Sequence, residues 1–120
     1  MYKIKIWGRE FELKVIYDCY AGEEILPLQK EAFESFSKNS TAINDSQKAV
    51  EKYCLSENRK DIDLDQIDNI FKYVMPESIF VKRDGRIALM CRYKFDPEHG
   101  IAVVFNDGKF ENVGMQDIIL

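Results

Sequence analysis

Apolar and charged residues alternate at both ends of the chain, which is the pattern of β-strands with one buried face. Near the N-terminus, residues 3–6 and 11–15 each show this alternation. A two-residue turn at residues 8–9, of the Gly-X kind that hairpins use, pairs Ile6 with Phe11. That register keeps the apolar side chains of both strands on one face, so we predict an N-terminal β-hairpin.

The middle of the chain has helical periodicity instead. Pro27 suits the first turn of a helix that runs to about Lys38. A second helix is predicted from about Asn44 to Ser56, after a break at the sequence NSTAIND. A third, shorter helix is predicted to begin at Asp63 with an arrangement like a capping box, and to stop at Pro76.

The last third of the chain predicts a four-stranded antiparallel meander. Asp-Gly dipeptides at residues 84–85 and 107–108 separate strand-like runs, and this dipeptide favours a type I′ turn. In the run 86–95 the odd-numbered residues are apolar throughout, which predicts that they face the core.

A turn at residues 84–85 sets Ile79 against Met90 and Val81 against Ala88, on the face opposite Leu89. These four side chains form an apolar patch that the chain's own hairpin or helices, or a partner, must cover. Dimerisation through the patch around Met90 is therefore one hypothesis.

Residues 96–100, Asp-Pro-Glu-His-Gly, hold the only histidine of the chain. If they form the loop between two strands, Phe95 pairs with Ile101 and the core face continues across the connection. Asp at the entry, Pro next and Gly at the end suit a type I turn that closes with a left-handed residue. We interpret this stretch as a hairpin loop.

A catalytic role for His99 needs a nucleophile and an orienting group nearby. Cys91 is predicted to point into the core, where a thiol is inert, and no nucleophile, zinc or phosphate-loop motif occurs. One histidine and three scattered cysteines do not supply a structural zinc site. The residues therefore predict a protein that is not an enzyme and needs no metal or cofactor.

The sequence DIDLDQID, residues 61–68, begins like a calcium loop. Its sixth position is Gln66 instead of glycine and its twelfth is Lys72 instead of glutamate, so the calcium interpretation fails. Two interpretations stay open: carboxylates at a helix start, and an acidic patch for a cationic partner. The patch would consist of Asp61, Asp63, Asp65 and Asp68, with Glu57 adding to it.

Length and charge narrow the function. The 120 residues suit a single domain, 1–120, and the net charge of −4 argues against binding nucleic acid or an anionic membrane. Three cysteines without a C-x-x-C motif indicate a reducing compartment, and no apolar run approaches the roughly 20 residues of a membrane helix. We expect a cytoplasmic protein of the α+β class, with the N-terminal hairpin and the C-terminal meander as antiparallel sheet packed on two or three helices.

The C-terminal sequence YKFDPEHGIAVVFNDGKFENVGMQDIIL resembles a bacterial domain family of unknown function. Members end in a strand, a D-x-E-H-G loop, a strand, an (N/D)-G turn and a V-G-x-Q-D segment. The matching positions are Asp96, Glu98, His99, Gly100, Asp107, Gly108, Val113, Gly114, Gln116 and Asp117. Such domains often accompany polymorphic toxin loci, so the resemblance implies an immunity protein with no assigned catalytic residue.

Two main functions are expected from these observations. The first is a protein that binds and neutralises a cognate bacterial toxin without catalysis, using the acidic stretch first and the turn residues Glu98 and His99 second. The alternative is a small-molecule-binding or enzymatic domain with its site at the Asp96–His99 loop, beside Gln116 and Asp117. In that loop-centred alternative, Gln116 and Asp117 either line the site or simply tie the C-terminus to the loop.

Overall fold

All six strands form one sheet, in the order β1-β2-β3-β4-β5-β6, in a computed structural model that describes residues 1–120. The strands are β1 (Tyr2–Ile6), β2 (Arg9–Tyr17), β3 (Val74–Val81), β4 (Ile87–Tyr93), β5 (Ile101–Asn106) and β6 (Lys109–Gly114). The helices are α1 (Pro27–Lys38) and α2 (Ser40–Asn58), with short 3-10 turns η1 (Arg59–Asp61), η2 (Leu64–Gln66), η3 (Ile70–Lys72) and η4 (Gln116–Ile118). The α+β class and the mostly antiparallel sheet are confirmed.

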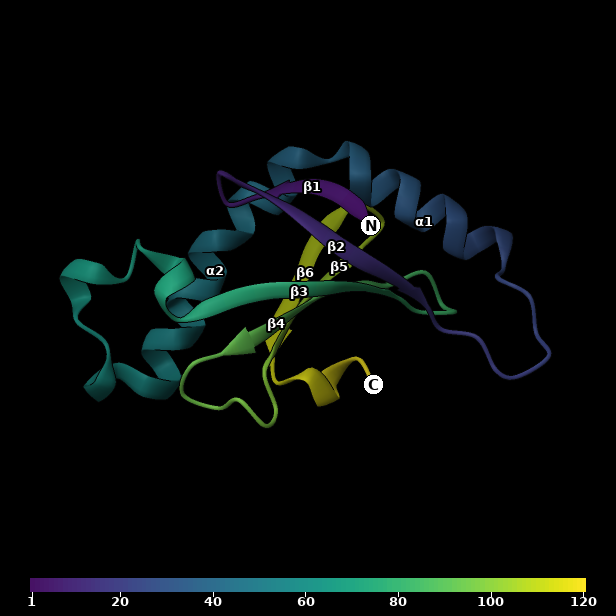
Figure 1. Cartoon of the computed structure of the whole chain (residues 1–120). Helices are drawn as coiled ribbons and strands as arrows, with labels where there is room; N and C mark the ends of the chain where they lie inside the picture. The colour runs from purple at the N-terminus through teal and green to yellow at the C-terminus, as the bar shows by residue number, and fades with distance from the viewer.

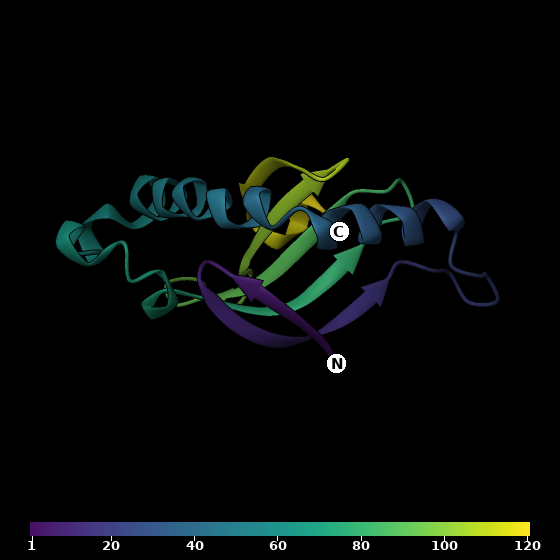
Figure 2. The same ribbon diagram turned by 90° about the horizontal axis from the view of Figure 1, so that it is seen from above.

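The two predicted pieces of sheet are joined by a parallel pair that the sequence pattern did not predict. Residues 14–17 of β2 run parallel to residues 78–81 of β3. Parallel neighbours need a crossover connection, and the segment with α1 and α2 provides it. The two helices lie end to end across one face of the sheet (Figures 1 and 2), while η4 lies on the opposite side. Neither helix is long and apolar enough to cross a membrane.

The N-terminal hairpin exists, but its turn is at Trp7-Gly8 and not at residues 8–9. Trp7 and Gly8 both have positive φ, 49° and 83°, as a type I′ turn requires. The indole of Trp7 is buried and donates a hydrogen bond of 3.0 Å to Ser46 Oγ of α2. Ile4 consequently pairs with Phe11. This shift of the register by two residues leaves the predicted faces unchanged.

The first helix has the predicted bounds, whereas the second begins four residues earlier than expected. The break is the single residue Asn39, at φ −103° and ψ 67°, and its side chain accepts a hydrogen bond from the amide of Ala42. The rest of NSTAIND is helical because this cap satisfies a free amide of the first turn of α2.

The predicted third helix is wrong. Residues 59–72 form three separate 3-10 turns, and Asp63 caps only the middle one by accepting a hydrogen bond from the amide of Asp65. Asn69 leaves helical conformation at ψ 64°. Asp and Asn side chains compete with the helical hydrogen bonds of the backbone, which favours such short turns. Pro76 does not stop a helix but lies in β3, beside a register shift typical of a bulge.

The patch predicted on the second face of the sheet has different members. The β3–β4 turn contains residues 83–85, closed by the Lys82 amide on the Arg86 carbonyl, and only Gly85 has a positive φ. This loop is one residue longer than a two-residue type I′ turn. The register of β3 against β4 therefore shifts by one residue, which exchanges the two faces of β3. Ile79 therefore pairs with Leu89 in the core, and Phe80 occupies the second face. The other Asp-Gly turn, at residues 107–108, has the predicted positive φ at both positions.

The second face is covered by the chain's own C-terminal segment, rather than by the hairpin or the helices. Ile119 is completely buried there against Ala88, Met90, Ala102 and Val104. Met90 is only 8% exposed, so it offers little surface for the dimer contact considered above.

The core face of β4 and β5 agrees with the prediction, although the pairing differs. Cys91, not Phe95, pairs with Ile101, because β4 ends at Tyr93 and the loop begins at residue 94. The register moves by an even number of residues, so the odd-numbered side chains still face the helices. Phe36 of α1 packs edge-on against Phe105, with ring centroids 5.1 Å apart.

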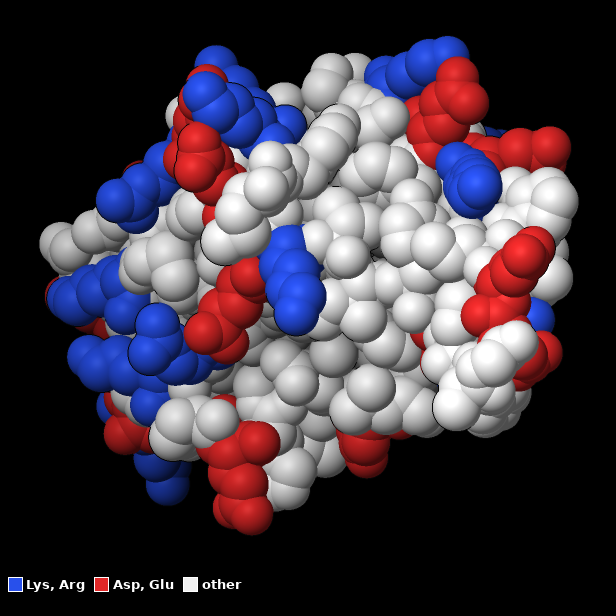
Figure 3. Space-filling model, turned by 45° about the vertical axis from the view of Figure 1, so that its right-hand side comes forward, with Lys and Arg blue, Asp and Glu red and all other residues white.

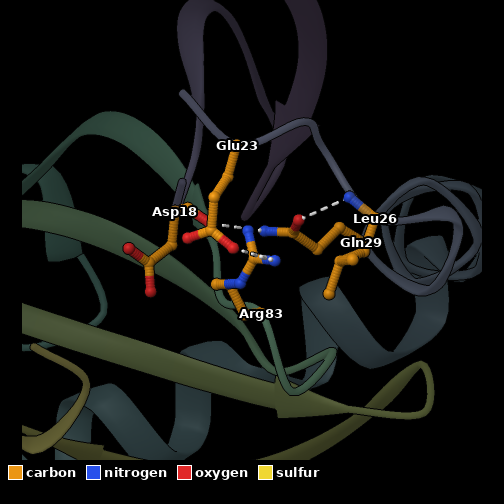
Figure 4. A network of polar contacts seen from close by, with 5 residues as sticks. All are labelled: Asp18, Glu23, Leu26, Gln29 and Arg83. Atoms are coloured by element: carbon orange, nitrogen blue, oxygen red, sulfur yellow. Dashed lines mark hydrogen bonds and ion pairs between the residues drawn. The ribbon is translucent and has the colours of Figure 1, made fainter. Parts of the chain in front are cut away.

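A buried glutamine locks α1 onto the sheet (Figure 4). Gln29 is completely buried. Its Nε2 donates to the carbonyls of Asp18 and Val81 at 3.0 and 3.1 Å, and its Oε1 accepts from the Leu26 amide. Beside it Arg83 pairs with Glu23, at 3.3 Å between Nη2 and Oε2.

Gln29→Glu is expected to lower the free energy of unfolding by about 2 to 4 kcal/mol, because a carboxylate cannot donate to the two carbonyls. Urea denaturation measures the loss. The matched control is Glu31→Gln, an exposed position on the same helix, which is expected to stay within about 0.5 kcal/mol of the wild type. Equal stabilities for the two variants would contradict this role of Gln29.

Candidate functional site

The loop that holds the histidine is a hairpin connection with internal hydrogen bonds. The amide of Gly100 donates to the Asp96 carbonyl at 2.9 Å, and the Asp96 amide donates to the Tyr93 carbonyl at 3.3 Å. Gly100 closes the loop at a φ of 62°. The interpretation of residues 96–100 as a turn with a left-handed end is thus confirmed.

His99 lies at the surface and contacts Asp96. Its Nδ1 is 3.0 Å from each carboxylate oxygen of Asp96, and its side chain is 54% exposed. The Asp96 hydrogen bond and charge raise the pKa of His99 above 6.5, with smaller contributions from Glu98 and Asp117. The nearest part of β4 offers no reactive thiol, since burial raises the pKa of Cys91 strongly.

The C-terminal segment is tied to this loop through Gln116. Its amide donates to the His99 carbonyl at 3.3 Å, and its Nε2 donates to the Cys91 carbonyl at 3.2 Å. Gly100 allows this close approach. A Cβ atom there would lie 2.6 Å from both the Cys91 oxygen and Gln116 Nε2. Gln116 therefore has the tying role that the sequence left open.

A pocket of about 250 Å³ opens between the loop, the C-terminal end of α2 and the residue after β6. Its lining combines three aromatic rings with carboxylate and amide groups: Tyr53, Glu57, Asn58, Tyr93, Phe95, Asp96 and Met115. The hydroxyl of Tyr93 donates to Asn58 Oδ1 at 2.7 Å, which fixes both side chains. Tyr93 also packs edge-on against Phe95, with centroids 5.6 Å apart.

The charged side chains that line this pocket, Glu57 and Asp96, are both acidic, and Lys94 Nζ lies 5.8 Å from the centroid of the Phe95 ring. Burial raises the pKa of Tyr53, and the charges of Glu57, Asp96 and Asp117 raise it further. His99 is the only cationic group paired with any of these carboxylates, and it contacts Asp96 alone. Glu57 and Asp117 thus have no compensating cation within 4.0 Å.

The predicted acidic residues Asp61, Asp63, Asp65 and Asp68 are all exposed. The Asp68 carbonyl accepts a bond from Gln47 Nε2, whereas the pocket lies at Glu57, about 15 Å further along α2. The stretch therefore begins three residues after Asn58, which lines the pocket, and reaches back along α2 as far as Asp68. Glu98 and His99 lie on the loop after β4. The side of the molecule in Figure 3 carries scattered acidic groups; many of its Lys and Arg groups lie towards the left edge, and others lie at the centre and upper right.

No three of the histidine, cysteine, aspartate and glutamate side chains are placed to share a metal ion. Three other hollows are larger: about 430 Å³ along α2, about 410 Å³ between α2 and β6, and about 310 Å³ between α1 and the two Asp-Gly turns. None of these three combines aromatic rings with both Asp and Glu side chains. The pocket beside the loop has that combination and is therefore the stronger candidate site.

Residues 1–120 match the model of a protein family described as a domain of unknown function, DUF6985. The chain belongs to this family. No curated protein and no solved structure matches this chain.

Sequence reasoning found Asp96, Glu98 and His99, and Glu57 as part of the acidic patch, but missed the aromatic half of the site. Tyr53 is only partly buried and packs against the core from α2. The four-residue spacing of Tyr53 and Glu57 was the available signal, because it places both on one face of a helix. Their meeting with Phe95 depends on tertiary structure alone.

Gly100→Ala is expected to destabilise the loop more than a left-handed residue alone would. The conformation costs alanine about 1 to 2 kcal/mol, and the clash with Cys91 and Gln116 adds to that. Gly22→Ala is the matched control, since Gly22 has a φ of 84° and no atom within 4 Å of the added Cβ. Urea denaturation should give a lower free energy of unfolding for Gly100→Ala than for Gly22→Ala. The reverse order would contradict the close approach of Gly100 to Cys91 and Gln116.

The His99 pair has a predictable pH dependence. Because the folded pKa is raised, protonated His99 stabilises the fold at low pH, and this stabilisation is lost as the pH rises through the folded pKa. An NMR titration of the His99 ring is expected to give a midpoint above 6.5. Asp96→Asn should lower that midpoint, and an unchanged value would mean that the pair does not form in solution.

Proposed function

We propose that this protein is a non-enzymatic, cytoplasmic immunity protein, which binds a bacterial toxin and blocks the toxin's active site. The observation that carries the proposal is the exposed end of the molecule around residues 94–100, where an aromatic pocket is lined by the unpaired carboxylate of Glu57 and by Asp96. The C-terminal D-x-E-H-G and V-G-x-Q-D resemblance supports a setting beside toxin genes.

The physical mechanism would be charge complementarity. A nuclease toxin must present a basic cleft to hold phosphates, and exposed carboxylates can take their place while speeding association. Glu98 is exposed and takes part in no ion pair, so its charge is available to a partner. In the acidic stretch, Asp61, Asp63, Asp65 and Asp68 would extend the contact along α2.

The size of the protein suits this mode of binding. A specific interface of ordinary size covers about 800 Å² on each partner, which is roughly one ninth of the total surface of 7114 Å². One end of a molecule 46 Å long can supply that area without the two helices or the sheet core rearranging.

The same pocket keeps the alternative function open for test, namely a small-molecule or enzymatic site at the Asp96–His99 loop. At about 250 Å³ it is slightly smaller than the pockets of drug-sized ligands. Under this alternative His99→Ala abolishes ligand binding or activity, whereas under the immunity proposal it weakens toxin binding only in part.

The test is co-expression with the product of the adjoining gene, followed by calorimetry of the purified pair. Wild-type protein is expected to restore growth and form a complex whose affinity falls with added salt. The variant Asp61→Asn/Asp65→Asn/Asp68→Asn is expected to bind at least about tenfold more weakly. Asp63 is left unchanged because its carboxylate caps the neighbouring turn.

A charge-matched control separates local contacts from net charge. Glu24→Gln/Glu31→Gln/Asp107→Asn also removes three exposed carboxylates, from positions outside the acidic stretch and the loop, and is expected to bind like the wild type. If both triple variants weaken toxin binding equally, the acidic stretch is not the contact surface. Absence of both protection and complex with the wild type would end the immunity proposal.

A further inference from the structure

The pocket beside the loop has two kinds of wall. Tyr53 and Glu57 lie one helical turn apart on α2 and face the same way, with Asn58 next to them. Phe95 and Asp96 come from the hairpin loop across the opening. Aromatic rings and carboxylates therefore converge on one small space from two separate segments of the chain.

The charged side chains around this pocket favour a cationic ligand. Glu57 has no cationic partner within 4.0 Å, and Asp96 is paired only with a histidine that is neutral at high pH. Asp117, outside the pocket lining, adds a weaker negative charge that also raises the pKa of Tyr53. A ligand that enters the pocket as an anion would face repulsion from all three.

The aromatic rings of the pocket favour a planar cation. Guanidinium stacks on aromatic faces, is more weakly hydrated than ammonium, and presents five donors to planar carboxylates. The Phe95 ring already attracts a cation of this chain, since Lys94 Nζ lies 5.8 Å from its centroid. Lys94 is exposed and does not line the pocket, but its charge opposes an incoming cation.

The size of the space fits one side chain. A volume of about 250 Å³ lies below the range of about 300 to 1,000 Å³ that holds drug-sized molecules. The Tyr93–Asn58 hydrogen bond holds the floor in place, so little ordering is needed when a side chain enters.

We infer that the pocket formed by Tyr53, Glu57, Asn58, Tyr93, Phe95 and Asp96 binds the guanidinium group of an arginine side chain presented by a partner protein. The inference rests on the proposed function only for the identity of that partner. Glu57 and Asp96 bind the guanidinium edge, and the aromatic rings contact its faces. The arginine is the anchor that the acidic surface around it steers into place.

The test uses the intact protein and a probe that needs no toxin, the blocked tripeptide acetyl-Gly-Arg-Gly-amide. Titration followed by ¹⁵N NMR is expected to shift the amide signals of Tyr53, Glu57, Asn58 and Phe95, with a dissociation constant of about 1 mM or weaker. The same peptide with citrulline replaces the guanidinium by a neutral group of equal shape, and it should bind at least about fivefold more weakly.

Three variants sharpen the test. Glu57→Gln is expected to weaken arginine-peptide binding by about fivefold or more, because it removes the uncompensated charge. Glu31→Gln, an exposed glutamate on α1, is the control and should bind like the wild type. Lys94→Gln removes the competing cation and is expected to tighten binding about twofold.

The inference is overturned if the citrulline and arginine peptides bind equally, if the shifts map outside the pocket, or if Glu57→Gln binds unchanged. The outcome is independent of the toxin experiment. If the arginine peptide binds but no toxin complex forms, only the immunity proposal is contradicted. A toxin complex that Glu57→Gln leaves at full affinity, with no peptide binding, would remove the arginine pocket alone.

Discussion

The parallel pairing of β2 with β3 is the constraint on which the rest of the molecule depends. It joins the N-terminal hairpin to the meander, and it obliges the chain between them to cross over one face of the sheet. That crossover is α1 and α2, end to end, and its path brings the end of α2 to the loop after β4 (Figure 1). The candidate site is therefore a consequence of the connection between β2 and β3.

Two polar anchors hold this crossover in register with the sheet. Gln29 bonds the start of α1 to the ends of β2 and β3, and Trp7 bonds the hairpin turn to Ser46 of α2. Buried polar groups are costly unless they are fully paired, so each anchor permits one position of a helix and disfavours others. At the far end the hydroxyl of Tyr93 does the same for Asn58, and this last bond forms the floor of the pocket.

Local patterns predicted the elements well where one face of an element is buried. The alternation in β4 and β5 gave the correct core face even though the pairing moved, because shifts by an even number of residues preserve the face. The odd shift at the 83–85 turn inverted β3 instead. Asp-Gly fits both a two-residue turn and the end of a three-residue loop, and only the tertiary packing of Ile79 distinguishes them.

The site could be predicted only in part, for a related reason. The residues Asp96, Glu98 and His99 stand together in the sequence, and turn chemistry places them on one loop. Tyr53 and Glu57 come from another element, and no periodicity states which loop a helix end will meet. The third predicted helix is wrong for the same lack of tertiary information, since Ile62, directly after η1, and Ile70, in η3, are buried in the core from separate places.

Structure and recognition compete for the same carboxylate at Asp96. Its carbonyl and side chain hold the loop closed through Gly100 and His99, and its charge also contributes to the pocket. Replacing Asp96 would therefore alter the loop and the electrostatic field at once. Glu57 has no such double role, because it lies exposed on a regular helix without an ion-pair partner. Asp96 therefore stabilises the loop, and Glu57 supplies the unpaired negative charge of the pocket.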